Sequence, residues 1–572
     1  MSNIDWLVLI GTLLFIVLYG VWKTRNISSV ESYLLGDRDL KWWTIGLSVM
    51  ATQASAITFL STPGQAYEDG MRFAQFYIGL PVAMVILCIF VLPIYYRLKV
   101  YTAYEYLEGR FDLQTRTLAA ILFLIGRGLA AGITIYAPAI ILSTILGWNL
   151  SLTIILIGAV VIMYTVLGGT KAVSQTQEQQ MIVILSGLVI AFFILLSQLP
   201  ANVHLSDALG VAGKMGKLKV IDFNFDWSNR YNFWSGMLGG TFLFLSYFGT
   251  DQSQVQRYLS GKSLTESRLG LLFNGIFKVP MQFGVLFVGL MVFVFFLFEQ
   301  PPVHFNQANL EQLRGTAYEA PLEALKVQST TVFEQKRSAI DALIQSMRAE
   351  DQAAISQAQL RVKTLHDQDL QIRESVRELI EQHDPQLETK DDDYVFISFV
   401  INYLPVGMVG LLLAVIFSAA MSSTASELNA LATTSVIDIY RRSLAPDRSD
   451  RHYLNVSKIM TILWGLLALA FAAFASLFDN LIEAVNIVGS VFYPIILGIF
   501  MVAFFLKSVG GRAVFIGALL GQVSVVTLYF LDHNEYINLA YLWLNIIGCF
   551  IVMILSVIFQ QLLPEEPLED PT

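Results

Sequence analysis

The sequence predicts an all-α integral membrane protein with about 13 transmembrane helices. Of its 572 residues, 55% are hydrophobic and only 14% are charged, and the mean hydropathy is +0.60. This is more apolar surface than a soluble domain can bury, so a bilayer must solvate most of it. Apolar runs of roughly 18–30 residues, each long enough to span a bilayer, recur along the chain. They lie near 6–22, 43–61, 73–96, 117–146, 150–167, 179–199, 233–250, 267–298, 395–425, 455–477, 482–506, 512–531 and 538–560.

Composition argues against several classes of function. The net charge of −9 argues against nucleic acid as a partner. Cys88 and Cys549 both lie in apolar runs, so the sequence has neither a disulfide framework nor zinc-ligand spacing. The six histidines lie outside the apolar runs. A membrane enzyme would need clustered His, Cys or paired acids at one depth, and we therefore expect no enzymatic activity.

The charges between the runs predict the orientation in the membrane. The first run lacks the basic start and small-residue cleavage site of a signal peptide, so we expect it to be retained. Its positive flank, Lys23 and Arg25, follows the run and predicts an external N-terminus. The loops then assigned to the cytoplasm all carry Lys or Arg. We expect a multi-pass plasma-membrane protein with a cytoplasmic tail at 561–572.

One polar segment, 299–393, interrupts this pattern. It is charged and helix-favouring, and its apolar residues recur at three- and four-residue spacing, which predicts two or three amphipathic helices. The topology places this insertion outside the cell. It is either a helical insertion without chemistry or a module that binds a protein partner.

Two apolar spans contain polar or small residues in the middle, which predicts interrupted helices. They are 42–64, "WWTIGLSVMATQASAITFLSTPG", and 235–257, "SGMLGGTFLFLSYFGTDQSQVQR". Interrupted spans free backbone carbonyls and helix ends for ions and solutes near the membrane midplane. The two are five spans apart, and a repeat of five spans inverts its topology, as in alternating-access transporters. The alternative is that small residues only allow close helix packing.

This spacing predicts the organisation of the chain. It comprises an extra N-terminal helix and loop (1–42), a first five-helix repeat (43–199), a second repeat (200–506) interrupted by 299–393, C-terminal helices (507–560) and the tail.

A cluster of hydroxyl side chains, "FSAAMSSTASELNALAT" at 417–433, lies within a later apolar span. Sodium is a hard cation that prefers oxygen donors, so Ser422 and Ser423 together with carbonyls of an interrupted helix could bind it. The alternative is that these serines hydrogen-bond to their own helix or serve in packing.

Several motifs together resemble the solute:sodium symporter family, whose members have the LeuT-type inverted-repeat fold. The matching stretches, which exclude 299–393, are "WWTIGLSVMATQASAITFLSTPG", "LPIYYRLKVYTAYEYLEGRF", "IYAPAIIL", "YTVLGGTKAV", "DQSQVQRYLSGKS" and "FSAAMSSTASELNALATTSVIDIY". They look closer to the branch that carries monocarboxylates, vitamins and sialic acids than to the glucose branch.

The resemblance implies a sodium site. By motif, its ligands are the carbonyls of Ala51, Ala54 and Ala419 and the side chains of Ser422 and Ser423. A second sodium site in some members needs an aspartate where this chain has Gln177, and a serine where it has Ala419. We therefore expect one sodium ion per cycle.

A different set of residues is predicted to contact the solute. Arg127 lies about ten residues into its span, roughly 15 Å deep at about 1.5 Å per residue, where a guanidinium could grip a carboxylate bidentately; it could instead pair with an internal acid. Lys278 and Glu483 match solute-side positions of family members, although Lys278 could pair with an acid and Glu483 could reach the interface. The remaining candidates, also by resemblance or position, are Ser55, Thr58, Gln75, Tyr247 and Phe248. Asp251 and Arg257 are interpreted as a surface ion pair.

The combined prediction is a sodium-coupled symporter that imports a small organic solute by alternating access. Arg127 favours an organic anion such as a sialic acid, sugar acid or monocarboxylate. Lys278 keeps a neutral sugar or polyol as the alternative. A transporter-like sensor is a more distant alternative, because the cytoplasmic tail is too short for a signalling domain.

Overall fold

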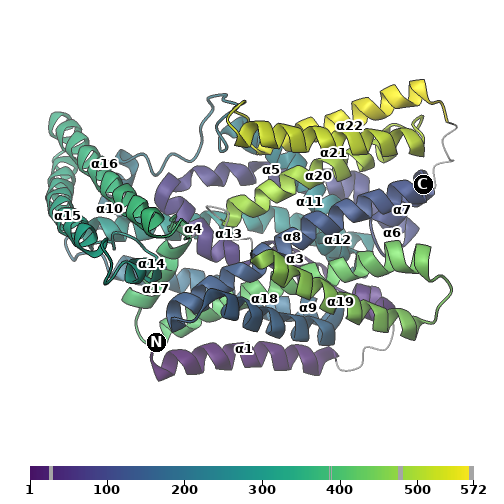
Figure 1. Ribbon diagram of the computed structural model, residues 1–572, viewed down its shortest axis with the longest axis horizontal. Helices are drawn as coiled ribbons and strands as arrows, with labels where there is room; N and C mark the ends of the chain where they lie inside the picture. The colour runs from purple at the N-terminus through teal and green to yellow at the C-terminus, as the bar shows by residue number, and fades with distance from the viewer. Residues whose placement is uncertain (25–29, 386, 388, 474–480, 566–572) are drawn as a thin grey trace.

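The computed structural model describes residues 1–24, 30–385, 387, 389–473 and 481–565, and helices dominate this part of the chain (Figure 1). It contains no β-strand in the described residues, only an isolated bridge between Leu40 and Gly261. Arg25, the end of the predicted run 455–477 and most of the tail 561–572 lie outside the described residues.

Each predicted apolar run is largely helical where it is described, and further helices lie between the runs. The first part of the chain forms α1 (Asn3–Thr24), α2 (Val30–Leu35), α3 (Trp42–Gln53), α4 (Ala56–Asp69), α5 (Gly79–Ile86), α6 (Leu92–Leu98), α7 (Tyr104–Arg110), α8 (Leu113–Leu146), α9 (Leu150–Ser197), α10 (Leu205–Lys214), α11 (Gly240–Gly249), α12 (Gln252–Leu259) and α13 (Leu264–Phe298). The second part forms α14 (Gln307–Gln312), α15 (Glu319–Arg348), α16 (Gln352–His383), α17 (Val395–Tyr403), α18 (Met408–Thr434), α19 (Asp450–Ala472), α20 (Leu481–Phe505), α21 (Gly511–His533) and α22 (Leu542–Leu562). Short 3-10 or π segments join or extend them: η1 (Gly36–Arg38), η2 (Gly70–Ile78), η3 (Leu87–Val91), η4 (Ser235–Gly239), η5 (Asp392–Tyr394) and η6 (Ser435–Leu444).

Length and hydropathy identify membrane-spanning candidates among the described residues. Nine helical segments are long and apolar enough to cross a bilayer, and two shorter apolar helices, Asn3–Ile16 and Leu150–Val166, accompany them. The predicted runs 150–167 and 179–199 form one element, α9, which changes direction at Gly169. The φ of 54° there suits glycine, and a Cβ would lie 2.6 Å from the ring of Tyr33.

Both predicted interruptions are present. The helix of the first span stops at Gln53 and restarts at Ala56, with Ser55 in an extended conformation between α3 and α4. The second interruption separates α11 from α12 at Thr250 and Asp251. Both breaks leave backbone groups at helix ends inside the helical bundle, where they are available to a ligand.

The 299–393 insertion forms a helical hairpin that protrudes from one end of the bundle (Figure 1). Its long helices α15 and α16 pack along each other and share a buried ion pair between Lys336 and Asp369 at 2.5 Å. Arg348 ties the hairpin to α10 through Asp207, also at 2.5 Å. Helix α1 begins at the same end of the molecule as the hairpin, and α22 ends at the opposite end (Figure 1).

Candidate functional site

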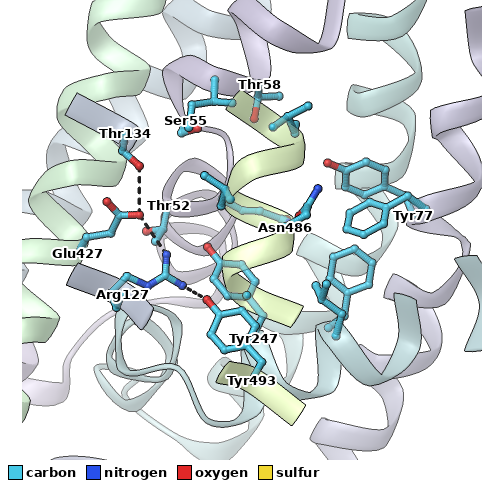
Figure 2. Close-up of a pocket in the computed structure, with 18 residues that line it drawn as sticks. Thr52, Ser55, Thr58, Tyr77, Arg127, Thr134, Tyr247, Glu427, Asn486 and Tyr493 are labelled. Atoms are coloured by element: carbon cyan, nitrogen blue, oxygen red, sulfur yellow. Dashed lines mark hydrogen bonds and ion pairs between the residues drawn. The ribbon is translucent and has the colours of Figure 1, made fainter. Parts of the chain in front are cut away.

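A cavity opens beside the break between α3 and α4. Its walls come from α3, α4, η2, α8, α11, α18 and α20, so elements far apart in sequence meet here (Figure 2). The lining residues are Thr52, Gln53, Ser55, Ile57, Thr58, Phe76, Tyr77, Arg127, Thr134, Leu243, Phe244, Tyr247, Glu427, Ile482, Val485, Asn486, Gly489 and Tyr493. Aromatic rings and hydroxyl or amide groups thus share the walls, which suits a small amphipathic solute.

A cluster of buried charges forms one side of the cavity. Arg127 donates from Nε to Asp251 at 2.9 Å and from one terminal nitrogen to Glu427 at 3.0 Å. Its other terminal nitrogen bonds both Asp251 and the Tyr493 hydroxyl. Figure 2 shows the guanidinium between Glu427 and the tyrosine rings. Arg127 therefore pairs with internal acids, the alternative that its sequence position left open.

The cluster contains one guanidinium and two carboxylates. Arg127 and Glu427 are only 3% and 5% exposed. One oxygen of Glu427 accepts from Arg127, and its second oxygen has no hydrogen-bond partner among the described residues. A buried carboxylate oxygen without a partner is costly, so Glu427 depends on the bond that Arg127 donates to its first oxygen. Tyr247 contributes by placing its ring 5.2 Å from the guanidinium carbon.

Asp251 also starts the helix α12. Its other oxygen accepts hydrogen bonds from the backbone nitrogen and the hydroxyl of Ser253. Asp251 thereby caps the N-terminus of α12. Asp251 and Arg257 are 1% and 0% exposed and do not contact each other in an ion pair. Their interpretation as a surface ion pair is wrong, because α12 is buried among neighbouring helices instead of lying at the surface.

The predicted sodium ligands lie where α3 approaches α18. The Ser422 hydroxyl is 3.3 Å from the carbonyl oxygen of Ala51. Ser423 bonds back to the carbonyl of Ala419 at 2.9 Å, and Ala54 ends α3 at the break. All five candidates are buried. Hydroxyl and carbonyl oxygens from two helices are a donor set that fits a sodium ion.

Gln177 of α9 occupies the neighbouring position. Its Nε2 donates to the hydroxyls of Ser422 at 2.8 Å, Ser426 at 3.0 Å and Thr52 at 3.1 Å. Its Oε1 accepts a bond from Ser48. If residue 177 were a carboxylate, these hydroxyl oxygens could bind a second sodium ion beside it. In this protein they accept hydrogen bonds from the Gln177 amide instead.

The predicted solute-contacting residues divide into two groups. Ser55, Thr58, Arg127 and Tyr247 line the cavity. Ser55 precedes α4 without capping it through its side chain. The Thr58 N–H donates to the Ser55 carbonyl at 3.0 Å, so the N–H groups without a side-chain cap next to the cavity are those of Ala56 and Ile57, in the first turn of α4.

The other four predicted residues lie elsewhere. The Gln75 amide bonds the carbonyl of Tyr231 and the backbone nitrogen of Asp222. Phe248 packs against Tyr247. Lys278 is fully buried, and its ammonium has no hydrogen-bond partner among the described residues. Glu483 pairs with Arg230 at 2.5 Å in a separate outer hollow.

Several cavity residues carried no assigned role in the sequence analysis. Glu427 has the clearest signal, because a carboxylate within an apolar span is a functional hypothesis by default. Asp251, which holds Arg127, is interpreted from sequence only as part of a surface ion pair. Thr134, Asn486 and Tyr493 carry no comparable signal, and only the packing of α8 and α20 brings them to the cavity.

Comparisons with known proteins agree with this architecture. The model of the sodium:solute symporter family matches residues 33–318 and 386–521, and the stretch left between them falls in the hairpin. The chain is 27% identical over 496 residues to the human sodium/iodide cotransporter, covering 86% of this chain but 63% of that protein, less than two thirds of its length. It is 27% identical over 532 residues to mouse sodium-coupled monocarboxylate transporter 2, covering 92% of this chain and 71% of that protein.

A solved structure has the same fold. A Na⁺-coupled sialic acid symporter, determined in a substrate-bound outward-open state, superposes with a TM-score of 0.75 at 22% identity over 99% of this chain and 100% of that chain. The match to the family model over most of the chain shows that this protein belongs to the sodium:solute symporter family.

Proposed function

We propose that this symporter imports a small organic anion, such as a sialic acid, sugar acid or monocarboxylate, together with sodium. The observation that carries the proposal is the uncapped N-terminus of α4 beside the cavity. The positive end of a helix dipole and free N–H groups attract anions, and broken helices in transporters use them for this purpose. The monocarboxylate and sialic acid specificity of the relatives supports the same solute class.

In this proposal Arg127 shapes the cavity without gripping the solute. Its guanidinium is already held by Asp251, Glu427 and Tyr493. The anionic group of the solute is bound by backbone N–H groups of α4 and the hydroxyls of Ser55 and Thr58. The aromatic wall around Tyr77 and Phe244 receives the less polar part.

A neutral sugar or polyol remains the second candidate. The cavity contributes amides of Gln53 and Asn486 beside the two hydroxyls. The side-chain oxygen of Gln53 (Oε1) and the side-chain nitrogen of Asn486 (Nδ2) have no hydrogen-bond partner among the described residues. Unpaired amides facing a cavity suit the hydroxyl groups of a sugar.

We further propose one sodium ion per cycle, held by Ala51, Ala54, Ala419, Ser422 and Ser423. The contact between Ser422 and Ala51 supports this site. The Gln177 amide, which donates to Ser422, Ser426 and Thr52, argues against a second ion next to it. Sodium ties α3 to α18 and so raises solute affinity, and the solute must raise sodium affinity equally.

The proposed orientation has the N-terminus and the hairpin outside and the C-terminus in the cytoplasm of a plasma membrane. The start of α1 and the end of α22 lie at opposite ends of the bundle, which supports an N-terminus and a last helix end on opposite sides of the membrane (Figure 1). The long helices α15 and α16 of the hairpin lie outside the matched family region, and they are the proposed site for any protein partner.

Uptake into proteoliposomes tests the function. We expect an inward sodium gradient to drive accumulation of one member of a panel of radiolabelled monocarboxylates, sugar acids, sialic acids and neutral sugars. Ser422→Ala should raise the sodium concentration for half-maximal uptake by about tenfold, which equals the loss of roughly 1.4 kcal/mol of ion binding. Ser457→Ala is a matched control, because Ser457 is buried and bonds only its own helix. If the sodium gradient has no effect on the uptake of any solute in the panel, the proposal is contradicted.

A further inference from the structure

A continuous chain of buried hydrogen bonds leads from the candidate sodium site to α12. Gln177 bonds Ser422 through Nε2 and Ser48 through Oε1. The Ser48 hydroxyl lies 3.2 Å from that of Ser174, and Ser174 accepts from Arg257 at 3.2 Å. All of these side chains are essentially inaccessible to solvent. The chain therefore joins α18, α9, α3 and α12 through side chains alone.

Arg257 is unusual within this chain. Its guanidinium is 0% exposed and forms no ion pair with a carboxylate among the described residues. Its hydrogen bonds reach only neutral oxygens, those of Ser174, Ser253 and Thr170, at 3.2–3.5 Å. One terminal nitrogen has no partner within the described chain. A buried cation with long bonds to neutral groups is costly and gains much when water reaches it.

The position of Arg257 connects this cost to transport. Every residue of α12 is buried, and α12 packs against α18, α3, α11, α13, α2 and α9. It follows directly from Asp251, which holds Arg127 at the cavity. Figure 1 places α12 in the half of the bundle toward the end of α22. A solute that leaves the cavity on that side would therefore exit past α12.

We propose that Arg257 is a positioning residue through which sodium keeps this exit closed, with Gln177, Ser48 and Ser174 as the connecting residues. The inference rests on the proposed sodium site. Sodium bound by Ala51 and Ser422 holds α3 against α18. This keeps Gln177 and Ser48 aligned with Ser174, which accepts the hydrogen bond from Arg257. When sodium leaves, this support weakens, and hydration of the guanidinium favours movement of α12 away from the bundle.

Cysteine accessibility tests the link directly. Ser260, the buried residue that follows α12, is replaced by cysteine in a Cys88→Ala, Cys549→Ala background. Labelling by a membrane-impermeant maleimide is timed with and without sodium in the purified full-length protein. We expect sodium to slow labelling by at least about fivefold, the lower end of typical coupling between sites.

Variants that interrupt the series of buried hydrogen bonds should abolish the effect of sodium on labelling. Arg257→Gln and Ser174→Ala should both label at rates that do not depend on sodium, whereas Arg257→Lys, which retains a charged donor, should recover part of the protection. Ser457→Ala, outside the chain, should behave as the parent. Ser174→Ala serves where Arg257→Gln fails to fold, because it removes only one hydroxyl.

Binding of radioactive sodium to the same variants separates the two hypotheses. If the parent protein binds no sodium, the proposed sodium site fails, and this inference fails with it. If the parent binds sodium and is protected by it, but Ser174→Ala and Arg257→Gln are protected equally, the sodium site stands and the link through Arg257 is refuted.

Discussion

The Arg127 guanidinium bonds two carboxylates unequally, because two of its nitrogens donate to Asp251 and one donates to Glu427. At the scale of single residues, loss of the arginine should therefore cost more stability than loss of the Glu427 charge. Arg127→Gln leaves Asp251 and Glu427 buried without their shared cation, which should cost about 3–5 kcal/mol of stability. Glu427→Gln leaves the pair of Arg127 and Asp251 intact and should cost far less. Thermal unfolding of the purified variants in detergent shows which of the two substitutions lowers the melting temperature more. Equal melting temperatures for Arg127→Gln and Glu427→Gln would show that the ion pairs do not support the fold.

The same residues show what sequence could and could not predict about the site. The depth of Arg127 in an apolar span indicated a buried functional charge, because such residues are rare in membranes. Its partners could not be predicted, since Asp251 is 124 residues and Glu427 is 300 residues away along the chain. Only the packing of α8 against α18 and of α12 beside them makes these groups neighbours. Gln75 shows the same limit, because its amide partners Tyr231 and Asp222 come from a distant loop.

At the scale of elements, the break between α3 and α4 could be predicted from the sequence, because it lies in a run of small polar residues within an apolar span. The helices of the insertion were also predictable, because helical periodicity in a charged segment is a local property. Their arrangement as a hairpin was not, since the pair of Lys336 and Asp369 joins two separate helices across 33 residues of sequence. The packing of η5 at the foot of the hairpin against α4 had no sequence signal at all.

The foot of the hairpin should respond to pH. Asp391 lies between Arg373 and Arg377, at 3.0 and 3.2 Å. Burial alone would raise the pKa of Asp391, but the positive charge of Arg373 helps to lower it to about 2. For the adjacent Asp392, burial and then the negative charge of Glu68 raise the pKa to about 8. These two neighbours therefore contribute to stability in opposite directions as pH changes.

For Asp392 the folded state binds more protons than the unfolded chain between about pH 4 and pH 8. Protonated Asp392 therefore makes its whole contribution to the free energy of unfolding below about pH 4, and this contribution is lost as pH rises toward 8. We expect the parent protein to lose more thermal stability between pH 5 and pH 8 than Asp392→Asn does. Asp341→Asn, on an exposed part of α15, is the matched control and should behave like the parent. Identical pH profiles for the parent and Asp392→Asn would contradict the raised pKa.

At the scale of the whole molecule, the charge moved in one cycle distinguishes the two proposed solutes. One sodium ion with a monovalent anion carries no net charge, whereas one sodium ion with a neutral sugar carries one positive charge inward. A membrane potential contributes about 2.3 kcal/mol per elementary charge per 100 mV. With the ionised groups of the protein unchanged over the cycle, we expect uptake of the anion to be insensitive to an inside-negative potential imposed by a potassium gradient and valinomycin. Potential-stimulated uptake of an anionic solute would require a second cation per cycle, and so would contradict the assignment of Gln177 as a replacement for that ion's site.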